Sequence, residues 1–329
     1  MSETAFVIGC GSIGERHAKN LHSLGIDILV HDIDTEKQEK VAQKVQGTEY
    51  DSVDAGLDNN PDMAFVCTPS NHHIQPAMKA AEAGCDLFVE KPLSNTAKDV
   101  PELLEVVDKK NLISMIGCNY RFHPAIQTVK ENLEAGALGK IVSARIETGS
   151  YLPDWHPWED YREMYSAKKG VGGVLFDAIH GINYARWFFD DEAVVTAMLG
   201  HESSLDMEPE DTASLITQYE SGIQCEFHFD YIQRTPVKSG HITGEKGSIR
   251  WGGENKTVVR SEPTTDKWIL ETDYSDWEIN QMYVDMIEHF IDCVQTREKT
   301  TSPLREGWKD LQLALAAKKS ASEGRHIEV

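Results

Sequence analysis

The chain has 329 residues, and its 32 lysines and arginines against 54 aspartates and glutamates give a formal net charge of −22. A surface of this charge repels phosphate backbones, which argues against a nucleic-acid partner. The length predicts two domains rather than one core. No apolar run approaches the ~18 residues that a membrane span needs, and residues 1–4 resemble no leader, so we expect a soluble, cytoplasmic protein without a membrane partner. The six cysteines lack C-x-x-C spacing, so we predict neither disulfides nor a metal site.

The first thirty-two residues have the pattern of a strand, a tight turn, a helix and a second strand. The apolar run Ala5-Phe6-Val7-Ile8 has the composition of a buried strand. The turn Gly9-Cys10-Gly11-Ser12-Ile13-Gly14 follows it, and the expected helix over 15–24 ends at Gly25. A second strand over 28–31 then leads to Asp32.

The glycines of this turn and Asp32 predict a dinucleotide site. Gly9 permits the sharp turn, Gly11 lets the backbone approach a pyrophosphate, and Gly14 allows close packing of helix on strand. Unpaired N–H groups at the start of the helix favour an anion there. Asp32 follows Gly14 by 18 positions, near the ~20 expected for a carboxylate that binds ribose hydroxyls, which favours NAD over NADP. The alternative is a glycine-rich turn in some other βα unit.

Strand-like and helical segments continue to alternate up to residue 117. The expected strands are 63–67, 86–89 and 113–117, and the expected helices are 35–45, 74–83 and 96–110. This alternation predicts a right-handed, doubly wound parallel sheet, in which ligands bind beyond the carboxyl ends of the strands. The residues expected at this edge are Thr68, His72, Glu90, Lys91, Asn119 and Arg121.

After Phe122 short turns begin to separate successive strand-like runs. The expected strands are 140–150, 213–219, 223–231, 241–243 and 248–251, and the expected helices are 125–135, 174–189, 277–296 and 305–322. Such a succession predicts a mostly antiparallel sheet. The fold class is therefore α/β plus α+β. We expect a Rossmann domain over 1–122 and an α+β substrate-binding and oligomerisation domain over 123–329, with the helix over 305–322 a candidate to pack back on the first domain.

Three features of the sequence coincide: the glycine-rich first segment, Glu90-Lys91-Pro92, and a helix opened by residues 172–180. Together they resemble the Gfo/Idh/MocA oxidoreductases, the glucose-fructose oxidoreductase and inositol dehydrogenase family, over nearly the whole chain. The resemblance implies a nicotinamide-dependent enzyme acting on a sugar, cyclitol or nucleotide sugar. It also implies that Lys91 contacts the reacting hydroxyl, that His180 exchanges its proton and that Asp177 is the nearby acid. The stretch Asn119-Tyr120-Arg121 resembles the family's N-Y-R stretch, which borders the nicotinamide and the substrate.

Two positions depart from the family pattern. Members similar to inositol dehydrogenase place the acid four residues before the histidine, whereas Asp177 stands three before His180, so its assignment is weaker. Many members carry an aspartate three residues after the histidine, where this chain has Asn183. A carboxylate contact to a substrate hydroxyl would there become an amide contact.

The same residues suit the removal of hydride from a secondary alcohol. The hydroxyl proton must leave, and a histidine base contributes ~10²–10⁴-fold to the rate of such a step. A fixed ammonium such as that of Lys91 stabilises the developing alkoxide. Asp177 and His180 are three residues apart, so in a helix they would lie on the same face. The carboxylate could then orient the imidazole. The alternatives are a solvated loop lysine, a helix histidine satisfied by its neighbour and an ordinary helix carboxylate.

An irregular stretch over 152–169 concentrates aromatic and cationic side chains. Aromatic faces stack on sugar C–H surfaces and cations hold phosphate or carboxylate, so a substrate wall is expected, with core packing as the alternative. The predicted substrate-binding residues are Lys91, Arg121, Trp155, Trp158, Tyr161, Arg162, Asp177, His180 and Asn183. The predicted cofactor-binding residues are Gly9, Gly11, Ser12, Ile13, Gly14, Asp32, Thr68, Pro69, His72, Glu90, Lys91 and Asn119.

The sequence therefore predicts an NAD-dependent oxidoreductase that transfers hydride between the nicotinamide and a secondary hydroxyl or keto carbon of a polyhydroxylated substrate. Two alternatives are an NAD-dependent glycosidase that oxidises its sugar transiently and a non-catalytic dinucleotide-sensing regulator. One face of the broad second sheet needs a cover, so a homodimer or homotetramer through that sheet is expected.

Overall fold

The structure, a computed structural model, describes residues 3–253, 256–265 and 267–329. The chain forms two compact units, each built from two separate segments. Unit 1 comprises Met1–Asn119 and Ile279–Leu311, and unit 2 comprises Tyr120–Glu278 and Gln312–Val329. This division is into compact units, and the domain limits 1–122 and 123–329 remain predictions.

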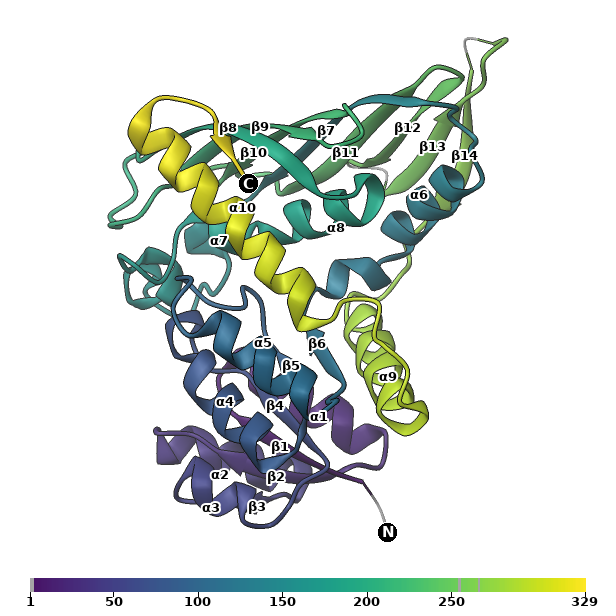
Figure 1. Cartoon of the computed structure of the whole chain (residues 1–329). Coiled ribbons are helices and arrows are strands. Elements are labelled where there is room, and N and C mark those ends of the chain that lie inside the picture. The colour runs from purple at the N-terminus through teal and green to yellow at the C-terminus, as the bar shows by residue number, and fades with distance from the viewer. Residues whose placement is uncertain (1–2, 254–255, 266) are drawn as a thin grey trace. The chain divides into compact units, whose positions relative to one another are not determined.

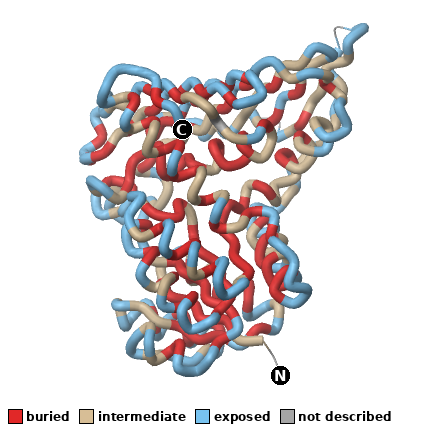
Figure 2. Tube along the Cα trace, viewed as in Figure 1, coloured by how far each residue is buried: buried red, intermediate tan, exposed pale blue. Residues whose placement is uncertain are grey.

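A six-stranded parallel sheet forms the centre of unit 1 (Figure 1). Its strand order is β3-β2-β1-β4-β5-β6, which confirms the predicted doubly wound sheet. The strands are β1 (Thr4–Ile8), β2 (Asp27–His31), β3 (Thr48–Glu49), β4 (Met63–Val66), β5 (Asp86–Val89) and β6 (Ser114–Ile116). All residues of β4 and β5 are buried, because helices cover both faces of the sheet (Figure 2).

The helices of unit 1 begin and end where local signals place them. They are α1 (Ser12–Ser23), α2 (Thr35–Val45), α3 (Val53–Leu57), α4 (Ile74–Ala83), α5 (Val100–Lys109), α9 (Gln281–Thr296) and the first part of α10 (Leu304–Glu323). Gly84 ends α4 in the left-handed region, and Asp34 caps α2 by accepting a hydrogen bond from the Lys37 N–H. The helix predicted from residue 96 begins only at Val100, because Asp99 before it has a φ of 59°.

Helix α9 belongs to unit 1 through aromatic packing. The rings of Phe65 and Phe88 on neighbouring strands stack at 4.7 Å between centroids. Phe290 of α9 lies edge-on to both, at 5.6 and 5.8 Å. Burial of these three rings explains why a segment so far along the chain completes the first core.

Unit 2 is built on a nine-stranded sheet with the order β14-β13-β12-β11-β7-β10-β9-β8-β15. Its strands are β7 (Ile141–Gly149), β8 (Glu192–Gly200), β9 (Thr212–Tyr219), β10 (Gln224–Asp230), β11 (Val237–Gly244), β12 (Gly247–Gly252), β13 (Thr257–Ser261), β14 (Trp268–Asp273) and β15 (Ile327–Glu328). The pair β7–β10 is parallel and the other pairs are antiparallel. The predicted mostly antiparallel sheet is therefore confirmed.

Helices cover one face of this sheet (Figure 1). The helices of unit 2 are α6 (Pro124–Glu134), α7 (Val174–Asp177), α8 (Ile179–Phe189) and the last part of α10. A Cβ on Gly181 of α8 would lie only 3.1 Å from Phe229 and 3.3 Å from Ile146, so glycine permits the close packing of α8 on the sheet. The prediction of a single helix over 174–189 is wrong in one detail. Two helices cover this range, because Ala178, with a ψ of 11°, separates α7 from α8.

The six cysteines are buried free thiols. Within residues 3–253, 256–265 and 267–329, no helix is long and apolar enough to cross a membrane.

Candidate functional site

The turn between β1 and α1 is shaped by its three glycines. Gly9 has a φ of +102°, and a Cβ there would lie 2.7 Å from the carbonyl carbon of Cys67. A Cβ on Gly14 would lie 1.8 Å from the Gly9 oxygen, so this position holds the helix against the strand. A Cβ on Gly11 would meet nothing within 4 Å. Backbone geometry therefore requires Gly9 and Gly14, whereas the structure itself does not require Gly11.

Asp32 is fixed at the end of β2 by two backbone donors. Its carboxylate accepts hydrogen bonds from the Cys10 N–H at 2.6 Å and the Asp34 N–H at 2.8 Å. The first of these donors belongs to the glycine turn, so the carboxylate is anchored to that turn. Helix α1 begins beside it, and Gly11 at its N-cap supplies no side chain to accept hydrogen bonds from the first N–H groups.

The remaining unit 1 candidates follow the carboxyl ends of β4, β5 and β6, as predicted. The 3-10 helix η1 (Ser70–His72) starts directly after Pro69, and the Thr68 hydroxyl donates to the His72 carbonyl at 3.1 Å. Asn119 begins the 3-10 helix η2 (Asn119–Phe122), and its buried Oδ1 accepts no hydrogen bond from the described residues. The His72 side chain is exposed.

Its neighbour His73, for which the sequence left a nicotinamide contact and a solvent-facing loop position as equal alternatives, joins two loops of this edge. Its ring nitrogens lie 2.7 Å from the Thr68 carbonyl oxygen and 2.9 Å from that of Pro92. The side chain is buried, and burial lowers the pKa of His73. His73 therefore ties the loop after β4 to the segment after β5, which contains Lys91.

Glu90 turns its carboxylate into the interior of unit 1. Its Oε1 lies 2.7 Å from Nε2 of His17 in α1, and its Oε2 accepts the Lys91 backbone N–H at 3.0 Å. A Cβ on Gly117 would lie 2.7 Å from Oε1, so glycine at 117 leaves room for the carboxylate. Through these contacts Glu90 links the glycine-turn helix to the backbone of Lys91.

In unit 2, Asp177 is the acceptor of three hydroxyl groups. Tyr165 donates to its Oδ1 at 2.8 Å, while Ser166 and Tyr231 donate to its Oδ2 at 2.6 and 2.5 Å. Burial first, and the Asp177 carboxylate second, raise the pKa of Tyr231 well above its ordinary value. Tyr231 therefore remains a hydrogen-bond donor, and the carboxylate is held in one orientation.

His180 lies close to Tyr120 in the same unit. Their ring centroids are 5.0 Å apart, and the Tyr120 ring stacks on His123 at 5.7 Å. The Tyr120 hydroxyl also accepts a hydrogen bond from the ammonium of Lys238. This ammonium lies 4.7 Å from the centroid of the Tyr120 ring. The predicted proton-transfer residue thus lies next to a tyrosine that contacts a cation.

Arg121 and Asn183, two predicted substrate-binding residues, bind each other. Arg121 Nε donates to Asn183 Oδ1 at 2.8 Å, and both side chains are buried. The guanidinium also lies 5.4 Å from the centroid of Trp187. The asparagine that departs from the family pattern thus accepts a charge-assisted hydrogen bond from this arginine.

The aromatic residues of the predicted substrate wall over 152–169 differ in their surroundings. Trp155 donates to the Ser150 hydroxyl at 2.8 Å and lies edge-on to Tyr231 at 5.4 Å, so it borders the hydroxyls around Asp177. Trp158 is 76% exposed and contacts the ring of His156 at 5.3 Å. The irregular stretch contains three short 3-10 helices, η3 (Leu152–Asp154), η4 (Tyr161–Glu163) and η5 (Tyr165–Ala167).

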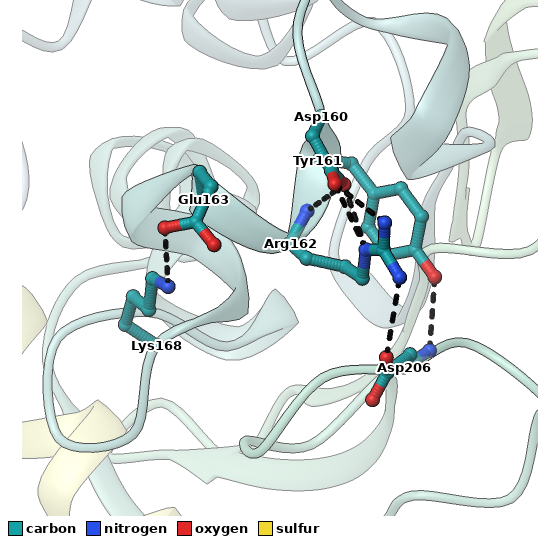
Figure 3. Close-up of polar contacts among 6 residues, drawn as sticks. All are labelled: Asp160, Tyr161, Arg162, Glu163, Lys168 and Asp206. Atoms are coloured by element: carbon teal, nitrogen blue, oxygen red, sulfur yellow. Dashed lines mark hydrogen bonds and ion pairs between the residues drawn. The ribbon is translucent and has the colours of Figure 1, made fainter.

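Two cations of this stretch, Arg162 and Lys168, form ion pairs with nearby carboxylates (Figure 3). Arg162 forms a bidentate pair with Asp160 and reaches Asp206 at 3.7 Å. The Asp206 N–H donates to the Tyr161 hydroxyl at 2.9 Å, and Lys168 pairs with Glu163 at 3.0 Å. Tyr161 and Arg162 therefore hold the loop together, which the sequence pattern did not indicate.

Sequence reasoning assigned no role to Ser166, Tyr231 or Lys238, because nothing in their neighbourhoods predicts tertiary partners. Tyr231 carries one usable signal, its place at the carboxyl end of an expected strand. Among the residues that the structure describes, no group of three or more histidine, cysteine, aspartate or glutamate side chains could hold a metal ion.

Comparison with known proteins identifies both halves of the chain. Residues 4–118 match the family described as "Oxidoreductase family, NAD-binding Rossmann fold", and residues 130–329 match its C-terminal alpha/beta domain. The myo-inositol 2-dehydrogenase of Thermotoga maritima is 28% identical over 98% of this chain and 97% of its own. The inositol 2-dehydrogenase of Rhizobium meliloti is also 28% identical, over 98% of each chain.

Solved structures of the same fold superpose on the whole chain. A levoglucosan dehydrogenase in complex with NADH gives a TM-score of 0.89 at 18% identity, covering 100% of this chain and 99% of its own. An oxidoreductase from Agrobacterium radiobacter in complex with NAD+, L-tartaric acid and magnesium gives 0.90 at 20% identity, covering 100% and 98%. The matches to both domain families show that the chain belongs to the Gfo/Idh/MocA family and is an NAD-dependent oxidoreductase.

Proposed function

We propose that this protein oxidises a secondary hydroxyl, or reduces the corresponding ketone, of a sugar, cyclitol or nucleotide sugar. The observation that carries the proposal is the position of His180, beside Tyr120 and three residues from a carboxylate held by three hydroxyls. Curated relatives that span the chain are named inositol 2-dehydrogenases, which supports a polyhydroxylated substrate.

The residues of unit 1 fit a dinucleotide. Open space at Gly11, the uncapped start of α1 and the anchored Asp32 carboxylate suit a pyrophosphate and a ribose. The buried Oδ1 of Asn119 is an acceptor that a bound ligand can satisfy. The carboxylate of Asp32 favours NAD over NADP, because it repels a 2′-phosphate. NAD, when bound, accepts or supplies the hydride.

Lys91 and His180 divide the remaining chemistry. The Lys91 ammonium stabilises negative charge on the reacting oxygen, and His180 takes the hydroxyl proton at a ring nitrogen. Asp177 acts through position: its three hydroxyl donors fix the carboxylate at the end of α7, immediately before the helix that carries His180.

Variants of these residues test the proposal. Lys91→Ala and His180→Ala should each lower kcat by about 10²–10⁴-fold, the usual contribution of such groups, while the Kd for NAD changes little. Turnover is followed by absorbance of reduced nicotinamide on a panel of sugars, cyclitols and nucleotide sugars. Lys79→Ala and His326→Ala, which change exposed residues, serve as controls. Unchanged turnover in both test variants would remove the assignment.

We also propose that two or four copies associate through the second sheet. Its strands present exposed apolar side chains, among them Met198 at 79% and Ile216 at 56% exposure. Sedimentation velocity of the native protein and of Ile216→Lys tests this proposal, which predicts a smaller species for the variant. The six buried free thiols are compatible with the cytoplasm, which we propose as the compartment.

A further inference from the structure

Lys238, a positively charged side chain, lies at the start of β11 on the face of the sheet that α8 covers. In the register of β11 and β7, Lys238 pairs with Thr148 and Gly240 pairs with Ile146. Side chains two residues apart share a face of a sheet, and Ile146 lies against α8 at Gly181. Lys238 therefore projects to the side of the sheet that carries His180.

The contacts of Lys238 connect it with His180. Its ammonium donates a hydrogen bond to the Tyr120 hydroxyl, and the ring of Tyr120 lies 5.0 Å from that of His180. The side chain is also exposed, so a ligand can reach it. One tyrosine ring thus separates an accessible positive charge from the residue proposed to move the proton.

Among the residues that the structure describes, no carboxylate pairs with the ammonium of Lys238. In the described part of the chain its partners are the Tyr120 hydroxyl and ring, both neutral. Arg234, in the connection between β10 and β11, similarly lies 3.5 Å from the centroid of Tyr151 without a carboxylate partner among the described residues. Contacts of this kind hold a cation in place and leave its charge available. Burial, and secondly the charge of Lys238, lower the pKa of His123 to about 4.

Arg162 and Lys168, two of the cations that the sequence suggested for anion binding, are in a different state. Arg162 pairs with Asp160 and Asp206, and Lys168 pairs with Glu163 (Figure 3). Their charges are already compensated inside the loop. Because the chain has a net charge of −22, an anionic ligand needs a local positive charge to overcome long-range repulsion.

We propose that Lys238 binds an anionic oxygen group of the substrate, a carboxylate or a phosphate ester. This inference rests on the proposed function of His180. It makes Lys238 a specificity residue that favours acidic or phosphorylated sugars over neutral ones. A lysine ammonium acts as a point charge and accepts either group, so the experiment compares both.

The test measures binding of three probes to the full-length protein saturated with NAD, by calorimetry. The probes are D-glucose, D-glucuronate and D-glucose 6-phosphate, which share a ring and differ in charge. We expect at least one anionic probe to bind tenfold or more tighter than glucose. Lys238→Met should lower that preference at least tenfold, whereas Lys238→Arg should retain most of it. Arg250→Met is the matched control, because Arg250 also lies over an aromatic ring, at 4.1 Å from Trp268.

The outcomes separate this inference from the proposed function. Equal binding of neutral and anionic probes, no binding of either anionic probe, or an equal loss for all probes in Lys238→Met overturns the inference. A role limited to supporting Tyr120 predicts the last of these results. Failure of every probe to reduce NAD, with the anion preference intact, counts against the proposed function and leaves the assignment of Lys238 in place.

Discussion

The Ser166 hydroxyl donates to the Asp177 carboxylate over 2.6 Å, inside unit 2. Ser166 belongs to η5 and Asp177 ends α7, so this hydrogen bond ties the irregular loop to the helix that precedes His180. Tyr231, directly after β10, donates to the same oxygen. One carboxylate therefore joins a loop, a helix and a strand.

Asp177→Asn should destabilise the protein and lower turnover. The amide keeps one acceptor oxygen but replaces the other by a donor, so hydrogen bonds to a charged group worth about 1.5–3 kcal/mol are lost. Urea unfolding measures the free energy, and steady-state kinetics measure kcat. Tyr231→Phe should cost more stability than Tyr165→Phe, because Tyr231 is 1% exposed and Tyr165 is 45% exposed. Equal effects of the two would show that burial does not govern these bonds.

The elements of unit 1 were largely predictable because each depends on local signals. The glycine turn, the apolar strands and the glycine that ends α4 all act within a few residues. The break at Ala178 could not be predicted, since the sequence places neither glycine nor proline there. The pairing of Arg121 with Asn183 was equally hidden, because it joins residues 62 positions apart. Sequence reasoning thus predicted the residue types of the candidate site but not the hydrogen bonds that orient them.

Gly11→Ala and Gly14→Ala should separate cofactor binding from folding. Gly11 has a φ of −68°, which any residue adopts, and a Cβ there meets nothing, so Gly11→Ala should change stability by less than about 0.5 kcal/mol. The methyl group would occupy the approach to the pyrophosphate, so the Kd for NAD should rise about tenfold or more, equivalent to about 1.4 kcal/mol. Fluorescence titration with NADH measures this change.

Gly14→Ala should behave in the opposite way. Its Cβ would lie 1.8 Å from the Gly9 oxygen, so the helix must move away from the strand at a cost of about 3 kcal/mol or more. Thermal unfolding without NAD shows this loss directly. A stable Gly14→Ala protein, or a Gly11→Ala protein that binds NAD normally, would contradict the division between the two glycines.

Asp32→Ser should shift the cofactor preference toward NADP. Removal of the carboxylate takes away its repulsion of a 2′-phosphate and weakens NAD binding, so the ratio of the two Kd values should change about tenfold or more. The variant also loses the acceptor of the Cys10 and Asp34 N–H groups, so stability should fall by about 1.5–3 kcal/mol. Asp34→Ser is the matched control, because it removes a nearby charge and keeps a residue that can cap α2. An equal change of the Kd ratio in Asp34→Ser would show that loss of any nearby negative charge, rather than of Asp32 itself, causes the shift.

The protein should lose stability on acidification through His123. Burial first, and Lys238 second, lower the pKa of His123 to about 4, and its Nδ1 accepts the Ala125 N–H at the start of α6. The unfolded chain takes up the proton near pH 6.5 and the folded chain only near pH 4, so the free energy of unfolding falls as the pH drops through this window. The full loss is on the order of 3 kcal/mol, since each pKa unit corresponds to about 1.4 kcal/mol.

His123→Asn isolates this effect from the titration of other groups. The amide oxygen of asparagine can accept the Ala125 N–H, and the side chain does not titrate, so the capping bond survives while the proton linkage disappears. Urea unfolding of both proteins between pH 7 and pH 4 gives the comparison. Across this range the free energy of unfolding should fall less for the variant than for the native protein. The difference between the two falls should be about 3 kcal/mol. Parallel curves would mean that the proton affinity of His123 does not differ between the folded and unfolded chains.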